Sequence, residues 1–189
     1  MQISTVLGNG MVLQREVQNP VWGYTRPGEK VQLIIGEHYL ETQSDKDGYF
    51  EILLPSMKAG GPWEIGLWDT TDRYVFQDVL FGDVFLLGGQ SNMELPLSWI
   101  WDQAKEELAE IRNEQIRMFD LPKEYDFLKK RELLTQGKWV SACGKDLLAF
   151  SAAGYYAAAE IHKKEKIKEI LPMYFFRSPL KKPGILTTS

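Results

Sequence analysis

The residues with the clearest chemical potential are Gly88-Gly89-Gln90-Ser91-Asn92-Met93-Glu94, a glycine-rich segment with one serine at its centre. Two glycines allow the backbone to turn tightly and to bring a following side chain out of the fold. A serine presented at the carboxyl end of a sheet, where open α/β folds place their sites, can act as a nucleophile. Its backbone N–H can also help to hold an oxyanion. The same residue types form ordinary loops, so this pattern alone leaves both interpretations open.

The elements that must position this serine begin just before it. Residues 83–87 are an almost continuous apolar run, which is typical of a strand buried on both faces and places Ser91 beyond its end. The chain then alternates strands and helices, which predicts a parallel sheet with covering helices. The predicted order is a helix at 99–112, a strand at 115–121, a charged irregular stretch at 123–137 and a helix from 150 to about 168. Ser151 is in position to cap the last helix.

The part of the chain before Gly82 has a different pattern, with short strands and almost no helical periodicity. The predicted strands are residues 21–24, 31–35, 38–42, 49–54, 63–68 and 73–80. Turn sequences rich in Gly, Pro and Asp separate them, at 26–29, 45–48 and 59–62. We therefore expect an antiparallel β-sandwich over residues 1–80, followed by a partial α/β domain over residues 81–189.

Composition excludes several classes of protein. With 44% hydrophobic and 25% charged residues, the chain has enough apolar material for a packed core and is not intrinsically disordered. The formal net charge is -4, and the lysines near the C-terminus cluster at a predicted helix end, where cations suit the helix dipole. We therefore expect no nucleic-acid partner. No apolar run approaches the roughly 20 residues that span a bilayer, so we expect no membrane partner either.

Motifs for metals and cofactors are missing from the sequence. The single cysteine, Cys143, excludes a disulfide framework and any C-x-x-C metal or redox motif. Neither G-x-x-x-x-G-K-[ST] nor G-x-G-x-x-G occurs, which argues against a P-loop or dinucleotide enzyme. We expect neither a metal nor a cofactor. Residues 1–10 show no secretory signal, so the compartment stays open and is cytoplasmic for the chain as given.

The Ser91 segment and Gly82-Asp83-Val84 together resemble the Gly-Asp-Val-Trp…Gly-Gln-Ser-Asn-Met-Glu block of the sialate O-acetylesterase family, within the SGNH hydrolase superfamily. Further matching segments follow one another at natural spacings: residues 11–15, 21–23, 27–29, 60–62 and 150–155. The resemblance implies a β-sandwich followed by a flavodoxin-like SGNH domain with three layers. It also implies hydrolysis of O-acetyl esters on sugars, sialic acid among them. The family is often secreted or periplasmic.

The resemblance implies a role for each residue of the turn. Ser91 would attack the acetyl carbonyl and form an acetyl-enzyme, which water then hydrolyses. The N–H of Ser91 and a backbone N–H near Ser151 would face the oxyanion, although related families carry a glycine at the second position. Glu94 would be either a loop carboxylate or a substrate contact. The remaining residues would brace the turn: Gly89, Gln90 and Asn92.

The base that should activate Ser91 is not evident in this sequence. A serine hydroxyl needs a base within hydrogen-bond reach, normally a histidine steadied by a carboxylate. The chain has two histidines, His38 and His162, and both are expected at the surface. The family's downstream Asp-x-x-His pair and its next strand are absent, although residues 171–176 could imitate that strand. We therefore expect an incomplete triad and a truncated form with weak or no activity.

Two further expectations follow from the same residues. A parallel sheet without its later strands leaves an open edge and an uncovered apolar face, which predicts a homo-oligomer. The alternative to an esterase is a non-catalytic carbohydrate-binding or assembly module, in which Trp22, Trp63 and Trp68 could stack on sugars. Tryptophans in short strands are more often core residues.

Overall fold

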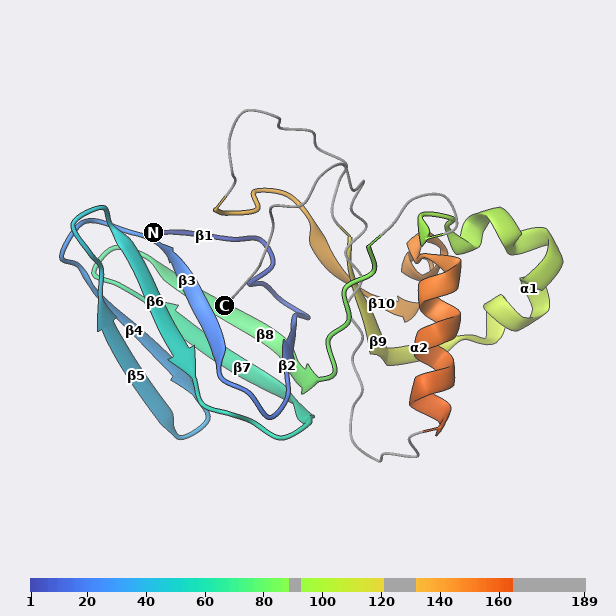
Figure 1. Ribbon diagram of the computed structural model, residues 1–189, viewed down its shortest axis with the longest axis horizontal. Helices are drawn as coiled ribbons and strands as arrows, with labels where there is room; N and C mark the ends of the chain where they lie inside the picture. The colour runs from blue at the N-terminus through green and yellow to red at the C-terminus, as the bar shows by residue number, and fades with distance from the viewer. Residues whose placement is uncertain (89–92, 121–131, 165–189) are drawn as a thin grey trace.

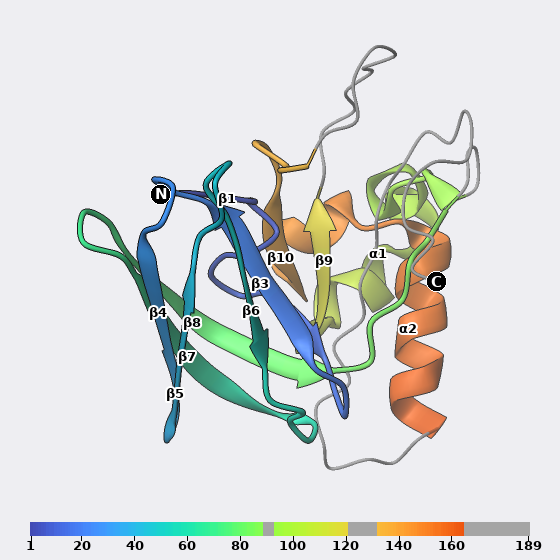
Figure 2. The same ribbon diagram turned by 60° about the vertical axis from the view of Figure 1, so that its left-hand side comes forward.

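The first 82 residues form two β-sheets that face each other across a shared core (Figures 1 and 2). The computed structural model describes residues 1–88, 93–120 and 132–164. Its strands in this part are β1 (Gln2–Ile3), β2 (Val12–Gln14), β3 (Asn19–Tyr24), β4 (Lys30–Ile35), β5 (His38–Gln43), β6 (Tyr49–Leu54), β7 (Gly60–Trp68) and β8 (Arg73–Gly82). All six strands predicted in this part are confirmed, and β1 and β2 are additional.

The smaller sheet has the order β1-β3-β6 and the larger has the order β2-β8-β7-β4-β5. Every pair in these sheets is antiparallel except β2 with β8, which run parallel with Val12 opposite Leu80 and Gln14 opposite Gly82. The parallel pair matters for the site, because it ties the start of the chain to the strand that leads into the Ser91 segment.

Strict alternation of apolar and polar residues explains why these segments are strands. In β4, Val31, Leu33 and Ile35 are fully buried, while Lys30 and Ile34 are exposed on the other face. Each buried aliphatic side chain of this size stabilises the fold by about 1.5–3 kcal/mol relative to its exposed state. Both sheets contribute buried side chains to one cluster: Leu7, Met11, Val21, Val31, Leu33, Ile35, Phe50, Ile52, Leu54, Ile65, Leu67, Phe76, Val79 and Phe81.

Gly48 provides a test of the turn before β6. Its φ is +83°, and a Cβ built on it would lie 2.2 Å from the Thr25 carbonyl oxygen, which is backbone and cannot move aside cheaply. Gly28 has a similar φ of +73° but no neighbour closer than 4.0 Å, so it is a matched control. We expect Gly48→Ala to lower the free energy of unfolding by about 2 kcal/mol more than Gly28→Ala does. Urea denaturation of both variants measures the difference, and equal losses would contradict the clash.

The second half contains η2 (Leu97–Ile100), α1 (Trp101–Glu110), β9 (Arg112–Asp120), β10 (Lys138–Cys143), η3 (Asp146–Ala149) and α2 (Ala152–Lys164). The predicted helix at 99–112 is therefore a 3-10 turn followed by α1, with a break at Ala104. The predicted strand at 115–121 is confirmed as β9, which starts earlier. Ser151 caps α2 as predicted, because its Oγ accepts a hydrogen bond from the Gly154 N–H at 3.2 Å.

The prediction of a buried parallel strand at residues 83–87 is wrong. These residues form no strand, and Leu86 is 70% exposed. An apolar run becomes a strand only where neighbouring strands supply hydrogen-bond partners. Here the Val84 N–H bonds instead to the Gln14 side chain, at 2.8 Å. Within the described residues β2 and β8 are the one parallel pair, because β9 and β10 pair antiparallel with each other.

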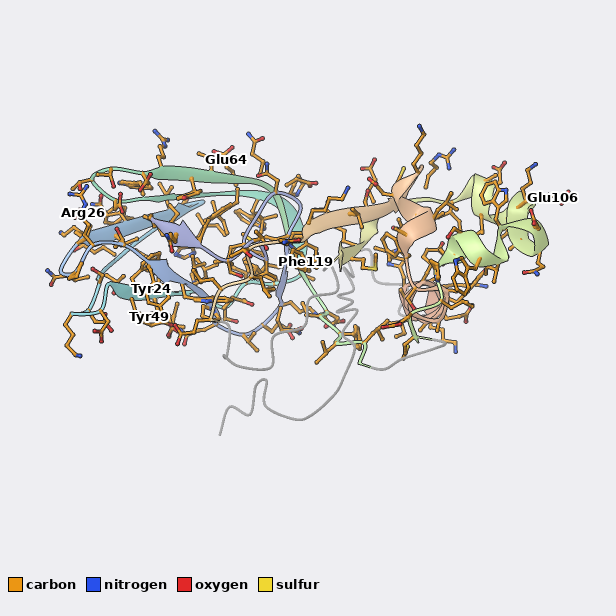
Figure 3. All side chains as sticks on the ribbon, turned by 90° about the horizontal axis from the view of Figure 1, so that it is seen from above. Tyr24, Arg26, Tyr49, Glu64, Glu106 and Phe119 are labelled. Carbon is orange, nitrogen blue, oxygen red and sulfur yellow. The ribbon has the colours of Figure 1, made fainter. Side chains whose placement is uncertain are left out.

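β9 lies between the sheets and the helices, and its residues 116–119 are buried on both faces of the strand (Figures 1 and 2). Ile116 and Met118 join a second core cluster together with residues of η2, η3 and α2. Phe119, labelled in Figure 3 at the junction, contacts the Trp139 ring edge-on with 5.4 Å between ring centroids. The Trp139 Nε1–H in turn donates to the Val6 carbonyl at 2.8 Å. This strand is the structural link between the two halves.

Candidate active site

The residue after β2, Arg15, is joined directly to the residue after β8, Asp83. The Arg15 guanidinium makes a two-point contact with the Asp83 carboxylate, with Nε–Oδ1 at 2.9 Å and Nη2–Oδ2 at 3.2 Å. The Arg15 N–H donates to the Gly82 carbonyl at 2.9 Å. A planar guanidinium paired with a carboxylate in this way fixes direction as well as distance. The chain therefore leaves β8 toward Ser91 from a defined starting point.

The segment that follows the Ser91 turn pairs with the segment that precedes α2. Pro96 and Ser151 form an antiparallel bridge. Two backbone hydrogen bonds flank it, from the Leu97 N–H to the Phe150 carbonyl at 2.9 Å and from the Ala152 N–H to the Leu95 carbonyl at 2.8 Å. Pro96 is five positions after Ser91 in the sequence. The bridge thus brings the continuation of the serine turn against the start of α2.

Ser151 is suited to a backbone role rather than a side-chain role. It is 7% exposed, and its hydroxyl is occupied by the capping bond to the Gly154 N–H. In an antiparallel pair flanked by hydrogen bonds on both sides, the N–H of the central residue points away from the partner strand. The Ser151 N–H therefore points away from Pro96, at the positive end of a helix of 13 residues. The N-terminal end of a helix stabilises a negative charge placed near it, such as that of an oxyanion.

The two histidines lie far from this end of α2. His38 is exposed at the start of β5, as predicted. His162 is half-buried rather than a surface residue, because it follows Ala158 by four positions on the buried face of α2. Its Nδ1 is enclosed and makes no hydrogen bond among the described residues. The helix carries His162 about 15 Å along its axis from Ala152, at 1.5 Å per residue.

Tyrosines near the start of α2 do not supply a base either. Burial raises the pKa of Tyr155, and the charge of Glu107 raises it further. Burial also raises the pKa of Tyr156, again with a contribution from Glu107. A phenol whose pKa lies above its ordinary value of about 10 remains protonated at neutral pH. Both hydroxyls can donate a hydrogen bond, but neither can take the serine proton.

The turn itself lies outside the described residues. Four of the predicted site residues fall there: Gly89, Gln90, Ser91 and Asn92. Residues 171–176, which could imitate the family's next strand, also lie outside the described residues. Glu94 is described and is half-buried directly after the turn, with its Oε1 shielded from solvent. Of the predicted site, the structure therefore describes Ser151 and the two backbone segments that lead to and from the serine.

Two properties of the described residues bear on ligands. No group of three or more His, Cys, Asp or Glu side chains lies close enough there to hold a metal ion. None of the helices in the same residues combines the length and apolar character needed to cross a membrane.

A solved structure of a carbohydrate acetylesterase is similar to this one. The structure is mostly β-sheet with few helices, and it superimposes on the crystal structure of a carbohydrate acetylesterase from Xanthomonas citri with a TM-score of 0.85 and 30% sequence identity. That match covers 92% of this chain and 39% of the other. No protein-family model matches the chain.

Curated sequences show to which family part of the chain is similar. The chain is 31% identical to the sialate O-acetylesterase of Mus musculus over 131 residues, which is 64% of this chain and 24% of that protein. It is 34% identical to the human sialate O-acetylesterase over 117 residues, which is 56% of this chain and 22% of that protein. The predicted resemblance to the sialate O-acetylesterase family is thus confirmed over the aligned residues. The chain spans less than a quarter of the length of these relatives.

Proposed function

We propose that the chain carries the nucleophile half of a serine esterase that removes O-acetyl groups from sugars, sialic acid among them. The observation that carries the proposal is the Pro96–Ser151 bridge, which sets the continuation of the Ser91 turn against the start of α2. The relatives named above support the reaction class, because they are sialate O-acetylesterases and a carbohydrate acetylesterase. The substrate of this chain would then be an acetylated carbohydrate.

The proposal includes a division of the chain. Residues 1–80 would be the β-sandwich of the family, since their buried side chains form one core. Residues 81–189 would be part of its SGNH hydrolase domain, whose described residues share a second core. The boundary falls after β8, where the first core ends at Phe81 and the second begins with Leu97.

In the proposed mechanism the Ser91 oxygen attacks the acetyl carbonyl carbon while a base takes the hydroxyl proton. The carbonyl oxygen becomes negative, and the backbone N–H groups of Ser91 and Ser151 would stabilise it. Collapse breaks the bond to the sugar oxygen, which takes the proton back from the base and leaves as a hydroxyl, and Ser91 remains acetylated. A water molecule then hydrolyses the acetyl-serine to acetate and restores the Ser91 hydroxyl. The described residues hold no histidine at this end of α2, so the chain by itself performs these steps slowly.

Site-specific labelling tests the proposal. Incubation with a fluorophosphonate should modify Ser91 slowly but selectively, because oxyanion donors and binding retain part of the rate when a triad member is missing. Peptide mass spectrometry over several hours locates the modified residue. Ser91→Ala should remove the label. Exposed Ser98 is an internal control, and labelling of Ser98 at the same rate as Ser91 would favour the non-catalytic alternative.

The proposal also includes self-association, as the exposed apolar surface near the site suggests. Leu86 is 70% exposed and Trp99 is 73% exposed, and they flank the turn in sequence. We expect a dimer or larger species by light scattering at micromolar concentration, and a monomer for Leu86→Asp. Leu53→Asp is the control, because Leu53 is also exposed but lies on β6 in the other half. A monomer mass for the unmodified chain would contradict the prediction.

A further inference from the structure

The outer face of the five-stranded sheet carries two aligned rows of side chains that point away from the core. Strand register places Glu41, Gln32, Trp68 and Arg73 in one row across β5, β4, β7 and β8. The neighbouring row is Tyr39, Ile34, Gly66 and Val75 on the same four strands. These residues alternate with core residues along each strand, which fixes their outward direction.

Trp68 is half-buried, and part of its ring lies beside the Gly66 backbone, where a larger residue would contact it. A Cβ built on Gly66 would be 3.4 Å from Cζ3 of Trp68 and 3.1 Å from Cγ2 of Ile34. The indole therefore extends over the Gly66 backbone. The Tyr39 ring lies beside it, with 6.4 Å between centroids and 52° between planes, and Tyr39 is 52% exposed. Together the two rings form an aromatic platform that is open to solvent.

The other tryptophans considered as sugar contacts face elsewhere. Trp22 and Trp63 are both partly buried against the first core cluster, and Trp22 lies on β3 of the smaller sheet. The Trp22 Nε1–H donates to the Glu132 carbonyl at 3.4 Å, and the Trp63 Nε1 is enclosed. Glu64, which Figure 3 labels at the outer edge of the sheet layer, marks the face on which Trp68 lies. Of these three tryptophans, Trp68 is the one whose position in the strand register places it on the outer face of the five-stranded sheet.

Polar side chains that can hydrogen-bond hydroxyl groups surround the platform and are bonded to one another. The Tyr39 hydroxyl accepts from Gln32 Nε2 and donates to Glu41 Oε2 at 3.3 Å. The Lys30 ammonium donates to the Glu41 carboxylate at 3.2 Å. At the other end of the row a hollow of about 380 Å³ opens beside Trp68 and Arg73, and the turn at residues 69–72 lines it.

We propose that this outer face is a carbohydrate-binding site, in which Trp68 and Tyr39 stack on the apolar C–H face of a pyranose and Gln32, Glu41 and Arg73 hydrogen-bond its hydroxyls. A pyranose presents one apolar face and a rim of hydroxyls, so it can stack on an aromatic ring that has polar groups at its edge. The charged groups of both signs pair or balance locally, which favours a neutral sugar. The proposal goes beyond the esterase reaction and does not depend on Ser91.

A second protein molecule fits this surface less well. The centres of protein interfaces are depleted of charged residues, whereas Lys30, Glu41 and Arg73 lie within or beside the two rows. The platform lies on β4, β5, β7 and β8, outside the core cluster that contains the start of α2, so a chain-like sugar could be held there without blocking the site. A bound polysaccharide would keep acetylated units near Ser91.

Affinity electrophoresis of the 189-residue chain tests the site. Native gels with and without soluble xylan, glucomannan or mixed-linkage β-glucan measure retardation, and calorimetry with the matching hexaose gives the affinity. We expect retardation by at least one polysaccharide and an affinity about tenfold weaker for Trp68→Ala. Gly66→Ala should also weaken binding, because its methyl group would displace the indole and Ile34. Trp99→Ala, which removes an exposed tryptophan outside the platform, should leave the affinity unchanged.

Several outcomes would overturn the proposal. These are no retardation by any of the three polysaccharides, equal retardation of Trp68→Ala and the unmodified chain, or a change of oligomeric mass in Trp68→Ala without any sugar binding. Circular dichroism of each variant shows whether the fold is retained. Ser91→Ala should bind as the unmodified chain does. Binding without Ser91 labelling would therefore refute the esterase proposal alone, and labelling without binding would refute this one alone.

Discussion

Replacing Arg117 with methionine is expected to lower the free energy of unfolding by about 2–4 kcal/mol. The guanidinium side chain is 7% exposed and donates four hydrogen bonds between the two halves and within β9. Its acceptors are the Gly10 carbonyl at 3.0 Å, the Asp78 carbonyl at 2.6 Å, the Asp78 carboxylate at 2.9 Å and the Glu114 carbonyl at 3.0 Å. Methionine fills similar space but leaves these acceptors without their donor.

The Asp78 side chain is 57% exposed and can be rehydrated, so most of the loss comes from the three carbonyl groups. Asp78 also has a φ of +58°, a strained value that the two contacts from Arg117 help to hold. Urea denaturation followed by fluorescence measures the change. A loss of 2–4 kcal/mol would lower the melting temperature by about 4–16 °C for a chain of this size.

Arg112→Met is the matched control, because Arg112 is an exposed arginine on the same strand. Among the residues that the structure describes, its guanidinium bonds to the nearby Ala109 and Ile111 carbonyls, at 2.9 and 2.7 Å. This variant should change the free energy of unfolding by less than about 0.5 kcal/mol. If both variants lowered the free energy of unfolding by the same amount, the Arg117 side chain would make no specific contribution to the junction between the two halves.

The sequence predicted the strands of the first half well because the relevant information is local. Alternation such as that of Val31, Leu33 and Ile35 and the glycine turns between strands both act within a few residues. Arg117 could not be predicted in the same way. Its partners in the first half, Asp78 and Gly10, are 39 and 107 positions away in the sequence. Nothing in the neighbouring residues indicates that this arginine is buried.

The error at residues 83–87 has a related cause. An apolar run shows that a segment could be a buried strand, but the pairing strands decide whether it becomes one. Gln14 occupies the Val84 N–H, and Phe85 and Leu86 remain exposed on the described surface. β10 was overlooked because Lys138–Cys143 follows a charged stretch that concealed its alternation.

The candidate site was predictable as a set of residues rather than as a geometry. The resemblance pointed to Ser91 and Ser151, which lie 60 positions apart, and the Pro96–Ser151 bridge brings the segment after one against the other. The contact between Arg15 and Asp83 joins two segments that the resemblance had used only as matching sequence. Pattern matching therefore identified segments that flank Ser91 and lie close to other matched segments, without giving the contacts that hold them there.

The second large effect concerns turnover. The 189-residue chain should hydrolyse p-nitrophenyl acetate or an O-acetylated sugar barely above background, about 10⁴-fold below a serine hydrolase with a complete triad. Removing the general base leaves no group to take the proton of Ser91, so Ser91→Ala should change the measured rate little. Initial rates with and without each variant, corrected for spontaneous hydrolysis, give the comparison.

His162 is the residue on which this prediction depends. It is on the buried face of α2, and the helix places it about 15 Å along the axis from the end that the Pro96–Ser151 bridge contacts. Its Nδ1 makes no hydrogen bond among the described residues, so no carboxylate there orients the ring as a catalytic base requires. His162→Gln should therefore leave the rate unchanged. Robust turnover that both Ser91→Ala and His162→Gln abolish would show instead that the ring reaches the serine and that the two residues act as a dyad.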